Sequence, residues 1–123
     1  MRNIYVGLIG WGNIGTGVVR LLQQNEKMIT RKLGAKLILK KIADINITSP
    51  RGVDIPRNIL TTNAREILDD PEISIVIELM GGYEPARTFV LKAIKNGKHV
   101  VTANKALLAT YGNQIFPAAQ KKN

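Results

Sequence analysis

Short apolar runs alternate with stretches of helical periodicity along the whole chain. The apolar runs have the length of buried β-strands and cover residues 4–9, 36–43, 59–62, 73–79 and 99–102. The run at 36–43 contains three lysines, so we expect that strand to lie nearer an edge of the sheet than the first. The run at 59–62 ends in two threonines and is the weakest of the five.

The first helix is predicted to follow the first strand directly. Gly34 ends it, because a helix commonly stops at a glycine that adopts a left-handed conformation. Five apolar residues recur at helical spacing before that point: Ile14, Val18, Leu21, Leu22 and Met28. Residues 46–58 contain two prolines and a glycine, and we expect them to form a loop.

Three further helices are predicted from the residues at their ends. Asn63 is expected to cap a short helix over residues 64–68. Pro85 suits the first turn of the next helix, which Gly97 ends. Asn104 is expected to cap a final helix that runs towards the end of the chain.

This alternation of strands and helices predicts an α/β fold with a doubly wound parallel sheet and helices on both faces. At 123 residues there is room for one domain, which we assign to residues 1–123. The expected strand order is 3-2-1-4-5. In such sheets ligands bind beyond the carboxyl ends of the strands, where the order reverses.

The turn after the first strand carries the main chemical signal. It reads Gly10-Trp11-Gly12-Asn13-Ile14-Gly15. In a Rossmann-type dinucleotide site, the first glycine permits a tight turn and the second lets the backbone approach the pyrophosphate. The third allows the helix to pack closely on the strand, and the helix dipole favours the phosphates. The alternative is a strand-to-helix turn with incidental glycines.

Asp44 follows the second strand and is the only acid there. Its carboxylate is predicted to accept hydrogen bonds from the adenosine ribose and to repel a 2′-phosphate, which favours NAD over NADP. It lies further from the glycine turn than the ~20 residues usual for such an acid, and it could be an ordinary loop-capping aspartate. Lys40, Lys41 and Arg51 are near in sequence and offer an alternative site for a phosphate.

Composition narrows the other possibilities. The chain has no cysteine and one histidine, which argues against disulfides and a zinc site and fits the cytoplasm. No apolar stretch approaches the ~20 residues that span a bilayer. The formal net charge is +9, but the basic residues are scattered and only 5% of residues are aromatic. We therefore expect a solvated surface that attracts an anionic cofactor, and no nucleic acid or metal.

Three segments, residues 6–19, 78–86 and 97–109, resemble the amino-terminal NAD(P)-binding domain of homoserine dehydrogenase. The most specific is the last, which reads Gly-Lys-His-Val-Val-Thr-Ala-Asn-Lys-Ala-Leu-Leu-Ala. The resemblance runs over essentially the whole chain. It implies an oxidoreductase that interconverts L-homoserine and L-aspartate 4-semialdehyde with NAD(P), on the route to threonine, methionine and isoleucine.

The resemblance also implies roles for individual residues. The glycine turn would hold the pyrophosphate, and Met80 with Gly81 would lie along the cofactor. Ala103 and Asn104 would approach the nicotinamide ribose. Lys105 matches the active-site lysine of the family, and an ammonium there would stabilise alkoxide charge or relay a proton.

Each of these roles has a structural alternative. Lys105 could be a solvent-facing lysine at a helix start. Glu78, at the end of the fourth strand, is either functional or a cap for the neighbouring turn. Many members of the resembled family carry an arginine near the end of the second strand that suits NADP, whereas here that place reads Ile42-Ala43-Asp44, which again favours NAD.

The region that binds the amino-acid substrate and forms the homo-oligomer in that family would follow Asn123. We therefore expect this chain to bind the dinucleotide without turning over. The competing interpretations are a cofactor domain of another aspartate-pathway dehydrogenase, or a non-catalytic dinucleotide- or nucleic-acid-binding module.

Overall fold

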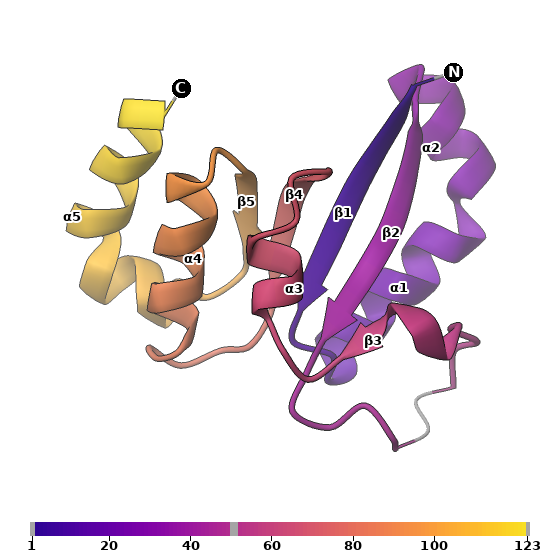
Figure 1. Cartoon of the computed structure of the whole chain (residues 1–123), viewed down its shortest axis with the longest axis horizontal. Helices are drawn as coiled ribbons and strands as arrows, with labels where there is room; N and C mark the ends of the chain where they lie inside the picture. The colour runs from indigo at the N-terminus through magenta and orange to yellow at the C-terminus, as the bar shows by residue number, and fades with distance from the viewer. Residues whose placement is uncertain (1, 50–51, 123) are drawn as a thin grey trace.

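The apolar runs assemble into one five-stranded sheet in the computed structural model, which describes residues 2–49 and 52–122 (Figure 1). The strands are β1 (Asn3–Ile9), β2 (Lys36–Ala43), β3 (Leu60–Thr61), β4 (Ile73–Glu78) and β5 (His99–Thr102). All neighbouring pairs are parallel, and the order is β3-β2-β1-β4-β5. This confirms the predicted sheet and its order.

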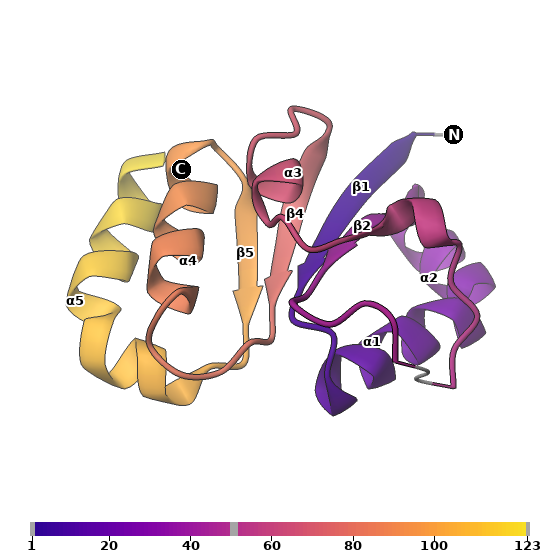
Figure 2. The ribbon, with the colours of Figure 1, turned by 60° about the horizontal axis from the view of Figure 1, so that its bottom comes forward.

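Helices cover both faces of the sheet, as predicted (Figures 1 and 2). They are α1 (Asn13–Gln24), α2 (Glu26–Leu33), the 3-10 turn η1 (Arg57–Ile59), α3 (Arg65–Leu68), α4 (Ala86–Lys95) and α5 (Lys105–Lys122). The helices α1 and α2 lie on one face, and α3 and α4 lie on the other. The last helix, α5, packs against α4 through a separate apolar cluster.

The central strand β1 is buried on both faces because its side chains alternate between two apolar clusters. Leu8 packs with Ile42 and Val19 on the α1 face. Ile9 packs with the cluster that contains Ile67, on the α3 and α4 face. This alternation follows from the two-residue period of a strand, and it places the end of β1 at the middle of the sheet.

The predicted first helix is in fact two helices separated at Asn25. The backbone of Asn25 has φ −112° and ψ 17°, outside the helical range. Its side-chain amide donates a hydrogen bond to the carbonyl oxygen of Leu21 at 2.9 Å, and its backbone N–H donates to the same oxygen. A side chain that competes for backbone acceptors weakens a helix, which accounts for the break.

The apolar residues expected to face the core from this region are mostly exposed. Ile14 and Leu21 are 66% and 59% exposed, and Met28 is 47% exposed. The residues of α1 that are buried are Gly15, Thr16 and Val19. The helix therefore approaches the sheet with its smaller side chains, which allows close packing beside the glycine turn.

The expectation that 36–43 lies nearer an edge is also correct. The outer neighbour β3 has two residues and pairs only with Ile42 and Ala43. The loop expected over 46–58 is largely irregular in its described part, although η1 begins at Arg57.

Candidate functional site

All the long strands end at the same edge of the sheet, where the connecting turns gather (Figure 2). Gly10 follows β1, Asp44 follows β2, Leu79 follows β4 and Ala103 follows β5. The sheet order reverses between β1 and β4, so the crevice expected for a ligand lies over the glycine turn.

Gly10 is required by the geometry of the turn. Its φ of +101° is a conformation that residues with a side chain rarely adopt. A Cβ at this position would stand 2.7 Å from the carbonyl carbon of Leu79. The N–H of Gly10 donates to the carbonyl oxygen of Ala43 at 2.9 Å, which ties the turn to the end of β2.

The other two glycines of the turn have different surroundings. A Cβ on Gly15 would overlap the carbonyl oxygen of Gly10, so this glycine permits the close contact between α1 and the turn. A Cβ on Gly12 would meet nothing within 4 Å. The backbone at Gly12 therefore borders open space, where a phosphate group can approach closely.

The beginning of α1 is suited to an anion. Within the described residues, no side chain caps α1 and no acidic residue lies in its first turn. The first N–H groups of a helix have no intrahelical partner, and the dipole makes this end positive. The turn thus presents donors and partial positive charge towards the open space beside Gly12.

The carboxylate of Asp44 is held by two backbone groups. Its Oδ2 accepts a hydrogen bond from the N–H of Trp11 at 2.5 Å, and its Oδ1 accepts one from the N–H of Asn46 at 3.2 Å. Asp44 therefore does cap local structure. Each carboxylate oxygen has a second lone pair, so the group retains the capacity to accept two ribose hydroxyls.

A pocket of about 350 Å³ lies beside the glycine turn. Four predicted cofactor residues line it: Gly10, Gly12, Asp44 and Met80. Its other lining residues are mainly apolar and were missed by sequence reasoning: Ile9, Ala43, Ile45, Thr62, Ala64, Leu79, Pro85 and Phe89. Several of them come just after β2, β3 and β4 in the sequence. The predicted ends of these strands could therefore have identified them. An apolar pocket with one carboxylate suits an adenosine.

A second hollow of about 610 Å³ is also lined by Asp44. Its lining residues come from the glycine turn, from α1 and from the loop after β2: Trp11, Gly12, Asn13, Thr16, Arg20, Asp44, Ile45 and Asn46. The indole of Trp11 is 4% exposed and packs with Leu8 and Val19. Its backbone N–H donates to Asp44, so that group is not available to a phosphate.

Six of the predicted site residues line neither hollow: Ile14, Gly15, Gly81, Ala103, Asn104 and Lys105. Gly15 has the packing role described above. Ala103 and Lys105 are exposed at the beginning of α5, beyond the end of β5. Within the described residues, the ammonium of Lys105 makes no hydrogen bond or ion pair.

The ends of β4 and β5 are joined by a chain of hydrogen bonds. Glu78 is fully buried, and its carboxylate accepts from the hydroxyl of Thr102 at 2.6 Å and from the N–H of Met80 at 2.8 Å. The N–H of Asn104 donates to the Thr102 hydroxyl oxygen at 3.0 Å. The side chain of Asn104 donates to the carbonyl oxygen of Gly82 at 2.6 Å. Glu78 thus has the capping role that sequence reasoning left open.

Asn104 also caps α5 as predicted, because its Oδ1 accepts a hydrogen bond from the N–H of Leu107 at 3.0 Å. The cap fixes the first turn of α5, which begins with Lys105. The position of Lys105 is therefore set by the hydrogen bonds of its neighbour Asn104 and not by its own side chain.

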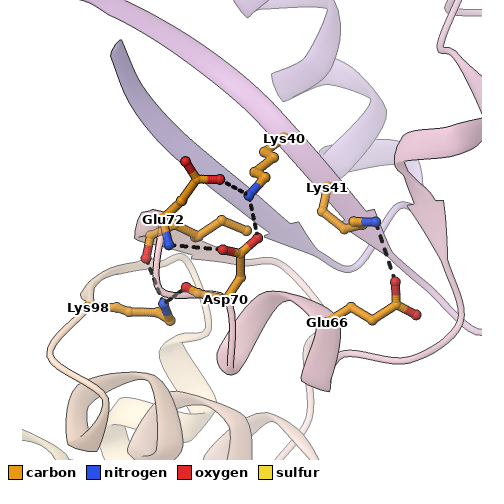
Figure 3. Close-up of polar contacts among 7 residues, drawn as sticks. Lys40, Lys41, Glu66, Asp70, Glu72 and Lys98 are labelled. Atoms are coloured by element: carbon orange, nitrogen blue, oxygen red, sulfur yellow. Dashed lines mark hydrogen bonds and ion pairs between the residues drawn. The ribbon is translucent and has the colours of Figure 1, made fainter. Parts of the chain in front are cut away.

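Lys40 and Lys41, the alternative phosphate site, already form ion pairs with carboxylates of the domain (Figure 3). The Nζ of Lys40 lies 2.7 Å from Oδ2 of Asp70 and 2.7 Å from Oε1 of Glu72. The Nζ of Lys41 lies 3.4 Å from Oε1 of Glu66. The hydrogen bonds that Lys40 donates to the carboxylates of Asp70 and Glu72 raise the pKa of Lys40 above its ordinary value. Arg51, the third residue proposed for that role, lies outside the described residues.

No group of three or more His, Cys, Asp or Glu residues in the described part of the chain is placed to hold a metal ion. No helix in that part has the length and apolar character needed to cross a membrane.

The parallel sheet, the helices on both faces and the open glycine turn at the point of order reversal define a dinucleotide-binding domain of the Rossmann type. A family model described as homoserine dehydrogenase, NAD binding domain, matches residues 10–123. The chain therefore belongs to the family of homoserine dehydrogenase NAD-binding domains.

Individual relatives agree with this assignment. The homoserine dehydrogenase of Methylobacillus glycogenes is 45% identical over 122 residues, which are 99% of this chain and 30% of that protein. The enzyme of Bacillus subtilis is 37% identical and is matched over 28% of its length. The crystal structure of a homoserine dehydrogenase from Thiobacillus denitrificans is 47% identical, with a TM-score of 0.89 over 99% of this chain and 28% of that one. The chain thus spans less than a third of each of these three relatives.

Proposed function

We propose that this chain binds NAD(P) across the carboxyl edge of its sheet, as the cofactor-binding part of an enzyme that interconverts L-homoserine and L-aspartate 4-semialdehyde. The observation that carries the proposal is the open backbone at Gly12, beside the uncapped positive end of α1 and the apolar pocket. Membership of the family supports the same conclusion.

The site supports one placement of the cofactor. The pocket of about 350 Å³ would hold the adenosine, and Asp44 would accept hydrogen bonds from its ribose hydroxyls. The N–H groups at the beginning of α1, beside Gly12, would hold the pyrophosphate. Met80, Gly81, Ala103 and Asn104 would hold the nicotinamide half of the cofactor.

Lys105 is the proposed catalytic residue. Its ammonium is exposed at the first position of α5 and makes no bond within the described residues, so it is available to a substrate oxygen. When bound, the nicotinamide supplies or accepts a hydride at the substrate carbon. The ammonium of Lys105 then stabilises negative charge on the substrate oxygen or relays its proton.

Asp44 is proposed to favour NAD over NADP, because its charge opposes a 2′-phosphate. An arginine in place of Ala43 would be an unsuitable test of this, since Ala43 is 3% exposed and the larger side chain would disrupt the core. Ile45 is 92% exposed and lines the same pocket. We therefore expect Asp44→Ala combined with Ile45→Arg to move the preference towards NADP.

Calorimetric titration of the 123-residue chain with NAD tests the binding function directly. Saturable binding that Gly12→Ala weakens is expected, and no binding of either NAD or NADP would contradict the proposal. The isolated chain is expected not to oxidise homoserine. Assays of the longer enzyme with homoserine and with free aspartate separate the proposed substrate from that of a related dehydrogenase.

The wider setting rests on the resemblance. We propose that the longer enzyme is a homo-oligomer, acts in the cytoplasm, and contributes to the formation of threonine, methionine and isoleucine. These statements concern a protein more than three times as long as this chain.

A further inference from the structure

We infer that Arg20 supplies the counter-charge for a 2′-phosphate, so that this site accepts NADP as well as NAD. The inference rests on the proposed binding of a dinucleotide and adds a cofactor-specificity residue to it. Sequence reasoning looked for such a cation beside the end of β2. The structure places one on α1 instead.

Arg20 lines the hollow of about 610 Å³ that Asp44 and Gly12 also line. Asp44, Gly12 and Ile45 line both spaces, so the apolar pocket and the hollow with Arg20 meet at these residues. A ribose whose hydroxyls lie at Asp44 has its 2′-position at this boundary. A phosphate on that hydroxyl would be directed into the hollow, away from the apolar pocket.

Arg20 is the only lysine or arginine among the described residues that line either space. Its side chain extends from α1 towards the loop after β2, since its Nη2 lies 3.4 Å from the position of a Cβ on Gly52. The guanidinium therefore lies between α1 and the loop after β2 and lines the hollow. Its planar donors match two phosphate oxygens, which a point charge does not.

The charge of Arg20 is also uncommitted, in contrast to other cations of the domain. Lys40, Lys41 and Arg87 each pair with a carboxylate within 4 Å. Within the described residues, the guanidinium of Arg20 has no carboxylate within 4 Å, and the carboxylate of Asp44 also lies beyond that distance. A positive charge with no protein partner, beside a proposed anion site, is available for the anion.

The bonds of Asp44 point the same way. Both of its oxygens already accept backbone N–H groups, those of Trp11 and Asn46. These bonds hold the carboxylate beside the turn, where Arg20 lines the same hollow. The cation of Arg20 can therefore offset the opposition of Asp44 to a phosphate, which predicts a site open to both cofactors.

The test is calorimetric titration of the 123-residue chain with NAD and with NADP at one fixed ionic strength. Arg20→Met keeps most of the aliphatic side chain and removes the charge. It is expected to weaken NADP binding at least tenfold and NAD binding less than twofold. Arg20→Lys keeps the charge without the planar donors and is expected to fall between the wild type and Arg20→Met for NADP.

Arg31→Met is the matched control, because it makes the same change of charge on α2, where the residue lines neither space. It is expected to leave both affinities within twofold. The inference is overturned if Arg20→Met weakens both cofactors equally, if it changes neither, or if the wild-type chain binds NAD but not NADP. Failure of the wild-type chain to bind either cofactor would instead overturn the proposed function itself, and with it this inference. Thermal melting of each variant confirms that it is folded.

Discussion

Two lysines lie at opposite ends of β5 and have opposite surroundings. Lys98 directly precedes the strand, is 8% exposed, and donates from its ammonium to the carbonyl oxygens of Asp70 at 2.5 Å and Ile73 at 2.6 Å. Lys105 follows the strand, is exposed, and makes no side-chain bond within the described residues. The same residue type is therefore structural at one end of the strand and available for chemistry at the other.

The contrast extends to the regions around these lysines. Near the amino ends of β4 and β5, Lys40 bridges Asp70 and Glu72 while Lys98 binds the carbonyls beneath them (Figure 3). Burial lowers the pKa of Lys98, whereas the carboxylates raise that of Lys40. At the carboxyl ends, the donors of α1, Arg20 and Lys105 face open space. The charges at the amino ends are paired inside the protein and contribute to the fold, whereas those at the carboxyl ends are placed where a ligand can reach them.

At the carboxyl ends of the strands, the largest loss of stability is expected from adding a side chain to the glycine turn. Gly15→Ala places a methyl group on the carbonyl oxygen of Gly10, so the turn and α1 must move apart. Overpacking against backbone costs about 3 kcal/mol. We expect the free energy of unfolding, measured with urea, to fall by about that amount.

Gly12→Ala is the matched control for this prediction. Its methyl group meets no atom within 4 Å, so stability should change by less than about 1 kcal/mol. The same methyl group stands where the phosphate approaches, so NAD affinity should fall at least tenfold, or ~1.4 kcal/mol. If Gly15→Ala were as stable as the wild type, the close approach of α1 to the turn would be contradicted.

The polar contacts near the amino ends of β4 and β5 are best tested at Lys98. Lys98→Met retains the aliphatic chain but leaves the carbonyl oxygens of Asp70 and Ile73 without their donor. Unsatisfied buried acceptors cost about 1–3 kcal/mol, so we expect a loss of about 2 kcal/mol in urea unfolding. Lys95→Met, an exposed lysine on α4, is the control and should change stability by less than about 0.5 kcal/mol. Equal losses in both variants would refute a special role for Lys98.

Sequence reasoning succeeded where a local pattern decides the structure. The bounds of β2 and β5 match the predicted runs, and the caps at Asn104 and Gly97 fall where expected. These features depend on residues adjacent in the chain. A buried strand between turn residues or a capping side chain has few alternatives, so the pattern was sufficient.

Sequence reasoning failed where residues distant in the chain decide the surroundings of a side chain. The partners of Lys40 lie 30 and 32 residues away, so the sequence did not show that its charge is already used. Ile14 and Leu21 fit a helical periodicity but not the face that α1 presents to the sheet. Arg20 was overlooked because only the fold brings α1 beside the end of β2.

The ion pairs at the amino end predict a smaller, pH-dependent effect. Burial by itself raises the pKa of Asp70, but the hydrogen bond from Lys40 and other donors hold it below its ordinary value. The pairing therefore contributes stability above the ordinary pKa of about 3.8, and this is lost as the pH falls through the lower folded value. Lys40→Met should cost less than about 1 kcal/mol at pH 7. The cost should vanish in strong acid.

Urea unfolding of the wild type and Lys40→Met at pH 7 and in steps down to pH 2 measures this dependence. Lys41→Met, whose partner Glu66 lies at the longer distance of 3.4 Å, provides the comparison and should cost less. A difference between wild type and Lys40→Met that stays constant with pH would show that packing of the side chain, and not the ion pair, is responsible.

Lys105 should give the smallest effect on the fold, and this completes the comparison with Lys98. Because its side chain contacts no partner in the described chain, Lys105→Met is expected to change the free energy of unfolding by less than about 0.5 kcal/mol. NAD affinity should stay within about threefold. In the longer enzyme, the same substitution should lower kcat strongly with homoserine. A loss of stability comparable to that of Lys98→Met would mean that Lys105 stabilises the fold, and the contrast between the two ends of β5 would no longer support the proposed role of Lys105.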